Sequence, residues 1–142
     1  MTISFAKRVF DHGIAPALTI AGTLSLFAVG ASPASAQSIA GSWAGAGTII
    51  YPSGERERAR CRATFRHSGG GGVAMHAVCA TASVRVTQNA ALSQLTNSTY
   101  SGEFTNTEYG IQGSIRIKLH SRSKMSASLS GGGGSAQFSL NR

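Results

Sequence analysis

Carboxylate side chains are scarce in this chain of 142 residues, which has five Asp and Glu against thirteen Lys and Arg. Beyond residue 36, the acidic residues are Glu55, Glu57, Glu103 and Glu108. Glu55 and Glu57 share one face of an extended segment but stand at its exposed end. A pair of carboxylates acting as general acid and base is therefore not expected.

The sequence patterns typical of metal sites and of activated nucleophiles are also missing. The sequence has two cysteines and four histidines, and the spacing of His67, His76 and His120 matches no zinc pattern. No serine stands in a Gly-x-Ser-x-Gly setting. The four glycines at 69–72 lack the Lys-Ser/Thr continuation of a phosphate-binding loop. We therefore predict a protein that is not an enzyme and has no catalytic residues, cofactor or metal.

The first 36 residues have the pattern of an export signal. Lys7 and Arg8 precede an apolar, uncharged run at 14–31, and the small-x-small triplet Ala34-Ser35-Ala36 follows. Signal peptidase reads such a triplet, so we predict a signal peptide at 1–36 that is cleaved. A retained anchor is the alternative, because the run approaches the ~20 residues that span a bilayer. Ala, Gly, Ser and Thr dilute the run, which favours cleavage and a mature form without a membrane span.

The predicted mature part, residues 37–142, is long enough for one modest core and hence for one domain. Without Lys7, Arg8 and Asp11 it keeps eleven basic and four acidic residues, a net charge of +7. Such a charge favours anionic partners. Both cysteines lie in this part, and an even number in an exported chain indicates a disulfide. The expected location is therefore the periplasm or the cell exterior.

Period-two alternation, which is typical of β-strands, recurs along 37–142, and helical periodicity is almost absent. We predict eight short strands, at 42–51, 55–67, 73–87, within 88–99, and at 100–106, 111–121, 125–130 and 135–142. Closure removes exposed edges, so the prediction is an all-β antiparallel up-and-down barrel, with a tight sandwich as the alternative. The many inward Ala, Gly and Ser residues predict a narrow, filled interior without a large ligand cavity.

The segment 55–67 has the strictest alternation. Small apolar residues and Cys61 share one face, and the other face carries Arg56, Arg58, Arg60, Arg62 and Arg66. If the hairpin formed with 73–87 is symmetric about Gly70, Cys61 lies opposite Cys79. Their Cβ atoms would then be ~4.5–5.5 Å apart, close enough to form a disulfide with modest adjustment.

This arginine row is the candidate binding site. Alternate side chains on a strand repeat every ~6.6 Å, and planar guanidinium groups suit phosphate, sulfate and carboxylate. We expect the row to bind an anionic envelope polymer or an acidic protein. The competing interpretation is a solvated face that keeps the barrel soluble. Nucleic acid is not expected, because no aromatic residues for base stacking interleave with the arginines.

Gly41-Ser42-Trp43 resembles the Gly-x-Trp signature at the first strand of the calycin superfamily, which includes lipocalins and small bacterial metalloprotease inhibitors. The signal peptide, the domain size and the cysteine pair after the Trp are similar to the secreted alkaline-protease inhibitors. The resemblance implies a barrel end closed by Trp43 and covered by a basic residue of the last strand, for which Arg142 has the inward parity.

Two further functions follow from this resemblance. The inhibitors insert an N-terminal trunk into a protease cleft, so the alternative function is protease inhibition through the N-terminal segment, with a protease as partner. Only residues 37–40 precede the Gly-Ser-Trp signature in the predicted mature chain. A small lipocalin-like carrier is the third hypothesis, and it requires an open apolar interior.

Overall fold

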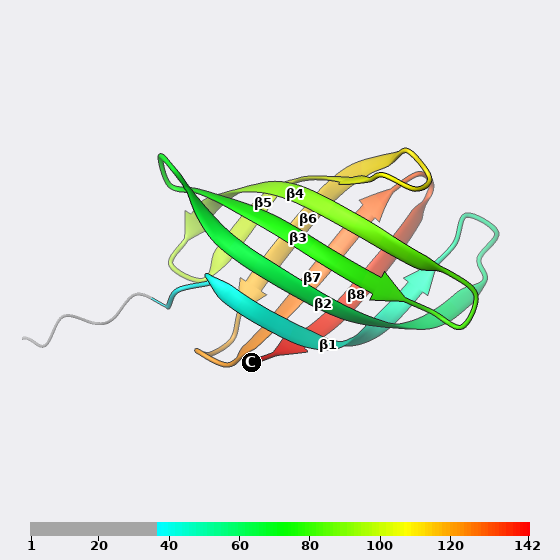
Figure 1. Ribbon diagram of the computed structural model, residues 1–142, viewed down its shortest axis with the longest axis horizontal. Coiled ribbons are helices and arrows are strands. Elements are labelled where there is room, and N and C mark those ends of the chain that lie inside the picture. Colours follow the sequence, from blue (N-terminus) through cyan, green and yellow to red (C-terminus); the bar gives the residue numbers. More distant parts are fainter. Residues whose placement is uncertain (1–36) are drawn as a thin grey trace, which may run out of the picture. The chain divides into compact units, whose positions relative to one another are not determined.

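The computed structural model describes residues 37–142, and the predicted signal peptide lies outside them. The strands are β1 (Gly41–Ile50), β2 (Arg56–Gly69), β3 (Gly72–Ala80), β4 (Arg85–Thr96), β5 (Thr99–Asn106), β6 (Ile111–Leu119), β7 (Lys124–Gly131) and β8 (Gly134–Asn141). Each strand pairs antiparallel with its sequence neighbours, and β1 also pairs with β8, which closes the barrel (Figure 1). The predicted up-and-down barrel is confirmed. Within residues 37–142, no helix is long and apolar enough to cross a membrane.

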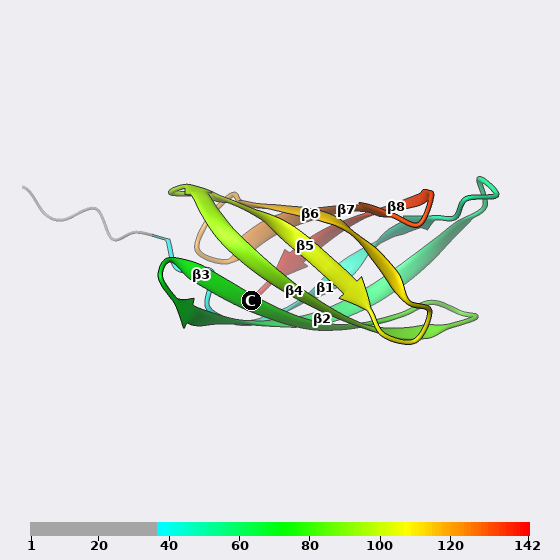
Figure 2. The ribbon, with the colours of Figure 1, turned by 90° about the horizontal axis from the view of Figure 1, so that it is seen from above.

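One hydrophobic core fills much of the barrel. Consecutive residues of a strand point to opposite faces of the sheet, so alternate side chains of every strand enter the interior. On β2, Ala59, Cys61, Ala63 and Phe65 are buried, whereas the arginines between them are exposed. The strands run obliquely around the barrel, as the view turned by 90° shows (Figure 2). Parity in the sequence therefore identified the inward residues of β2.

Two inward glycines allow strands to approach each other closely. A Cβ atom at Gly47 would overlap the carbonyl oxygen of Gln137 and the ring of Phe138. At Gly113, a Cβ atom would overlap the carbonyl oxygen of Ser130 and lie 2.8 Å from the ring of Phe104. Glycine inside a strand marks such close approaches and the bends that close a barrel. These residues therefore set the curvature of the sheet.

The structure corrects the strands predicted at 73–87 and within 88–99, because β4 (Arg85–Thr96) takes residues from both. The predicted strand 73–87 is interrupted, because β3 ends at Ala80 and the chain turns before β4 begins at Arg85. The hydroxyl of Thr81 accepts hydrogen bonds from the backbone N–H groups of Ser83 (3.1 Å) and Val84 (3.0 Å). A threonine hydroxyl can close a turn without glycine or proline. Glycine and proline are absent here, so the alternation concealed this turn.

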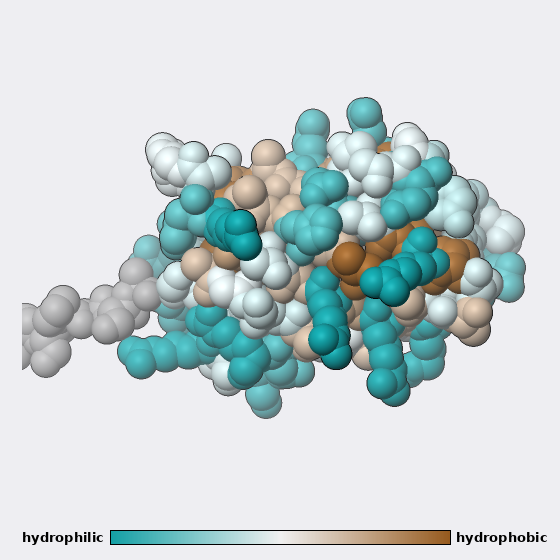
Figure 3. All heavy atoms as spheres, viewed as in Figure 1, coloured by the Kyte–Doolittle hydropathy of each residue, from teal (hydrophilic) through white to brown (hydrophobic). Residues whose placement is uncertain are grey.

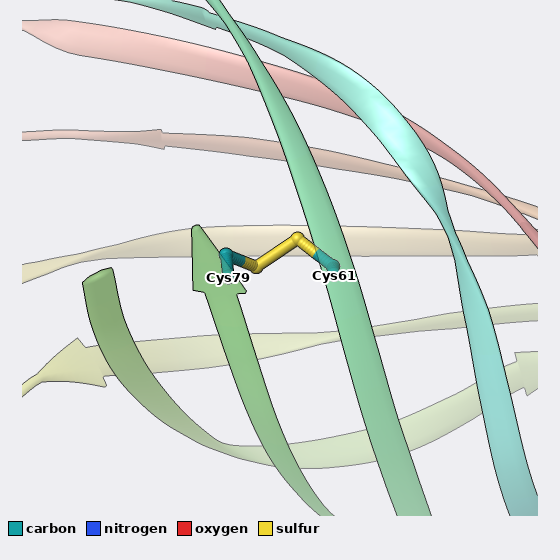
Figure 4. Close-up of a disulfide and its surroundings, with 2 residues drawn as sticks. All are labelled: Cys61 and Cys79. Atoms are coloured by element: carbon teal, nitrogen blue, oxygen red, sulfur yellow. A yellow bond between two sulfur atoms is a disulfide. The ribbon is translucent and has the colours of Figure 1, made fainter. Parts of the chain in front are cut away.

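The predicted disulfide is confirmed. Cys61 on β2 and Cys79 on β3 are directly opposite each other, with Cα atoms 4.1 Å apart, and their sulfur atoms are bonded (Figure 4). The pairing is symmetric about Gly70 as far as the pair His67 and Val73. Beyond that pair the register shifts at the glycine-rich tip of the hairpin.

Candidate functional site

One end of the barrel is closed around Trp43. Its buried indole donates a hydrogen bond from Nε1 to the carbonyl oxygen of Ile39 (2.9 Å). The guanidinium of Arg142 lies 4.4 Å from the centre of the Trp43 ring. It also donates to the carbonyl oxygens of Ser38 (2.8 Å) and Ala40 (2.6 Å). Arg142 thus joins the segment before β1 to the end of β8.

The opposite end of the barrel contains a cavity of about 330 Å³, which we call the mouth cavity. Its walls are mainly apolar and include Ile49, Val86, Phe104, Ile111, Leu129, Ala136 and Phe138. Residues of the loops that follow β1, β3, β5 and β7 surround its opening. A large molecule could not enter, but the space is sufficient for a small ligand.

The prediction of a filled interior is wrong at this end. In the closed half of the barrel, Trp43 and Phe65 fill the interior. At the mouth, Gly131, Gly134 and Ala136 of the β7–β8 hairpin line the space instead. Small inward residues alone predict a narrow barrel. They leave room, however, wherever no large side chain from another strand reaches across.

Glu57 holds two loops at the opening of the mouth cavity. Its carboxylate accepts hydrogen bonds from the hydroxyl groups of Tyr51 (2.9 Å) and Ser83 (2.8 Å). The hydroxyls of Thr81, Ser83 and Tyr51 hold the pKa of Glu57 below its ordinary value. Desolvation and the bond to Glu57 raise the pKa of Tyr51. An ionised carboxylate that accepts hydrogen bonds from hydroxyl groups therefore connects the β1–β2 and β3–β4 loops.

The β5–β6 loop is held in a similar way. The carboxylate of Glu108 accepts hydrogen bonds from the backbone N–H of Thr87 (3.0 and 2.9 Å), and this bond to the backbone lowers the pKa of Glu108. The side-chain oxygen of Asn106, which is only 4% exposed, accepts the backbone N–H of Tyr109 (3.1 Å). Hydrogen bonds within the chain thus hold the loops at the mouth.

We predict that Glu108→Gln reduces the dependence of stability on acidic pH. The pKa of Glu108 is lower in the folded chain than in the unfolded chain. Its stabilising contribution is therefore complete above the unfolded pKa of about 4.3 and is lost as the pH falls through the folded value. Thermal unfolding should show the variant below the wild type at about pH 7 and equal to it at about pH 2. Glu103→Gln, at an exposed position on β5, is the control, and an equal pH effect in both variants would contradict the prediction.

The predicted arginines lie side by side on the outer surface of β2 and are exposed. We call the set Arg56, Arg58, Arg60, Arg62 and Arg66 the basic face. Ala46 and Ala80 flank Arg60 on the neighbouring strands, and Ala44 and Val78 flank Arg62. The basic face therefore has small apolar neighbours at its centre instead of carboxylates.

The structure adds Arg85 to this surface. Arg85 pairs with Ala80, which pairs in turn with Arg60. Arg60 and Arg85 therefore stand on opposite sides of Ala80. A shallow hollow of about 890 Å³ extends over these residues and Ala46. Arg85 was not among the predicted site residues, because its position depends on the turn at 81–84. A correct prediction of that turn would have placed Arg85 beside the basic face.

The guanidinium groups of the basic face are available to a ligand. Among residues 37–142, the hydrogen bonds donated by arginine side chains all belong to Arg142. The carboxylates of Glu57 and Glu108 accept hydrogen bonds from hydroxyl and backbone N–H groups, as described above. Figure 3 shows long hydrophilic side chains that project from a surface with pale and apolar patches between them.

His67, His76 and His120 are exposed, and His76 lies on β3 between the residues that pair with Arg62 and Arg66. Nδ1 of His76 is 2.9 Å from Oδ1 of Asn89, and Nε2 of His120 is 2.9 Å from the hydroxyl of Ser126. In the part of the chain that the structure describes, no group of three or more His, Cys, Asp or Glu residues is placed to hold a metal ion.

No family model and no curated protein matches the chain. Among solved structures, it is similar to the redesigned β-barrel mFAP1 bound to DFHBI (TM-score 0.62, 15% identity, 72% of this chain and 94% of that chain). The redesigned barrel mFAP0 bound to DFHBI gives a TM-score of 0.62 at 15% identity, over 72% and 97% of the two chains. A de novo designed fluorescence-activating β-barrel gives a TM-score of 0.59 at 12% identity, over 75% and 95%. At these identities the similarity establishes the fold alone, a small closed eight-stranded antiparallel barrel, and assigns no family.

Proposed function

We propose that the chain is a non-enzymatic binding protein, exported to the periplasm or secreted, that holds a small apolar molecule in its mouth cavity. The observation that carries this proposal is the preformed apolar cavity of about 330 Å³. Ligand sites commonly occupy ~300–1,000 Å³, and the mouths of β-barrels are frequent places for them. The designed barrels mFAP1 and mFAP0, which share the fold, were solved with the small molecule DFHBI bound. The mouth cavity thus favours the hypothesis of a small carrier, which requires an open apolar interior.

We expect Ala136→Trp to block the mouth cavity. Ala136 is an inward residue of β8 that lines the cavity, so an indole at this position would occupy the ligand's space. Fluorescence titration with the neutral dye N-phenyl-1-naphthylamine should give saturable binding to the wild type. The variant should bind at least about tenfold more weakly, a loss of ~1.4 kcal/mol or more. DFHBI serves as a second probe.

Ala91→Trp is the matched control for this experiment. Ala91 is exposed on β4, so the same side chain is added outside the barrel. This variant should bind the dye as the wild type does, and both variants should unfold cooperatively. No binding to the wild type, or equal losses in the two variants, would reject the mouth cavity as the ligand site.

A second proposed function is the binding of an anionic partner, such as an envelope polymer or an acidic protein, by the basic face. The observation that favours it is the setting of Arg60 and Arg62, whose cross-strand neighbours are alanines and a valine and not carboxylates. Solubility alone does not require unpaired arginines in one row, because mixed charges serve that purpose. The basic face and the mouth cavity lie on opposite sides of the barrel wall, so one protein can have both functions.

Protease inhibition remains the alternative implied by the calycin resemblance, and no contact among residues 37–142 favours it. Ile39 is fully buried, and Arg142 binds the carbonyl oxygens of Ser38 and Ala40. A segment held in this way packs on the barrel end and does not extend toward a protease. Inhibition of a secreted metalloprotease by the wild type, lost on removal of residues 37–40, would restore this alternative.

A further inference from the structure

The basic face has the geometry of a line of charge. Along a strand, alternate residues repeat every ~6.6 Å, so Arg56 to Arg66 extend over about 33 Å. Arg85 stands two strands away from Arg60, a lateral distance of ~9.6 Å. One phosphate or sulfate ion would engage only a small part of this line. A ligand that carries many negative charges along its own length matches it.

The surface beside the arginines is lined by small side chains. Ala44 and Ala46 of β1 lie on one side, and Val78 and Ala80 of β3 lie on the other. These residues form the floor of the hollow that Arg58, Arg60, Arg62 and Arg85 border. A narrow polymer can rest on such a floor while guanidinium groups donate to its anionic groups from the side. Bulky residues at the same positions would keep the polymer away.

Other anionic macromolecules need side chains that this surface lacks. Among residues 37–142, the exposed large hydrophobic residues are Leu95 and Tyr109, and neither belongs to β1, β2 or β3. Insertion into a bilayer requires such residues, and stable protein interfaces usually combine arginine with buried aromatic anchors. Single-stranded nucleic acid requires aromatic stacking. A chain of carboxylated or sulfated sugars requires mainly guanidinium donors.

We infer that the basic face, completed by Arg85, binds a linear anionic polysaccharide that lies along β2. This inference rests on the second function proposed above and specifies its partner. Carboxylate and sulfate groups both present several oxygen acceptors to a guanidinium. The proposal therefore includes polysaccharides that carry either group. Arg58, Arg60 and Arg85 are the central residues, because they surround the alanine floor.

The test measures affinity for two polymers, polygalacturonate with carboxylates and dextran sulfate with sulfates, against neutral dextran. Anionic lipid vesicles and a single-stranded oligonucleotide are added as competing probes. Affinity is measured by calorimetry from about 50 to 200 mM salt, because release of counterions makes such binding fall steeply with salt. The wild type should bind at least one anionic polysaccharide more tightly than vesicles or oligonucleotide, and should not bind dextran.

Arg58→Ser with Arg60→Ser should weaken polysaccharide binding by at least about tenfold and lower the salt slope by roughly one per arginine. Arg85→Ser should weaken it as well, although Arg85 is on another strand. The matched control is Arg116→Ser with Lys118→Ser, which removes two exposed charges from β6. This control should retain the affinity, and all variants should keep the wild-type melting temperature.

The outcomes separate this inference from the broader function. Tighter binding to vesicles or oligonucleotide that still depends on Arg58 and Arg60 would overturn the polysaccharide assignment and keep the basic face as an anion site. Equal losses of affinity in the β2 and β6 variants would mean that binding depends on net charge alone. That result would overturn both the polysaccharide assignment and the basic face as an anion site. Absence of binding to every anionic probe would also overturn both.

Discussion

Replacing Trp43 with alanine should destabilise the barrel by about 3–5 kcal/mol, the range measured for truncation of large aromatic residues in cores. The indole is buried at the closed end, bonded to Ile39 and covered by Arg142. Truncation would leave a cavity, an unpaired carbonyl group and a guanidinium without the ring beneath it. Since domains of this size are stable by only ~5–15 kcal/mol, the variant should be close to unfolding.

Urea unfolding followed by circular dichroism measures this loss. Trp43→Phe is the comparison, because it keeps an aromatic ring and removes the N–H donor to the carbonyl of Ile39. That variant should lose about 1–3 kcal/mol, the cost of a buried polar group left unpaired together with some packing. A Trp43→Ala variant within about 1 kcal/mol of the wild type would show that Trp43 does not close the barrel end in the way described.

Removal of the disulfide, by Cys61→Ala with Cys79→Ala, should cost about 3 kcal/mol. The two cysteines are 18 residues apart, and closing a loop of about this length restricts the unfolded chain by ~3 kcal/mol in the chain-entropy model. For a domain of this size, the loss corresponds to a fall in melting temperature of roughly 10–20 °C. The effect should be large because the small inward residues of β2 and β3 supply limited core volume.

Reductant provides the internal control for this prediction. It should lower the melting temperature of the wild type toward that of the double variant, and it should leave the double variant unchanged. Neither cysteine lines the mouth cavity, so dye binding should persist in the double variant at temperatures where it is folded. A wild-type melting temperature that is insensitive to full reduction would contradict the stabilising role of the bond.

The candidate sites differ in how far the sequence predicted them. The five arginines of the basic face were identified from parity, since alternation on one strand is a local property. Arg85 was missed, because it joins the face only after a turn closed by the Thr81 hydroxyl. The mouth cavity was not predicted either. Its walls come from β1, β4, β5, β6, β7 and β8, and empty space depends on how far opposing side chains reach.

The sequence by itself determined the side of the wall on which each residue of β2 lies, the pairing of Cys61 with Cys79, and the class of fold. These features follow from the two-residue period of a strand and from the short hairpin around Gly70, both of which act between neighbours in the chain. Only the tertiary structure decided between a closed barrel and a sandwich, set the distance between Arg142 and Trp43, and left a cavity at one end of the barrel. Closure brings together residues from opposite ends of the sequence, and the register and curvature that set their distances belong to the whole sheet.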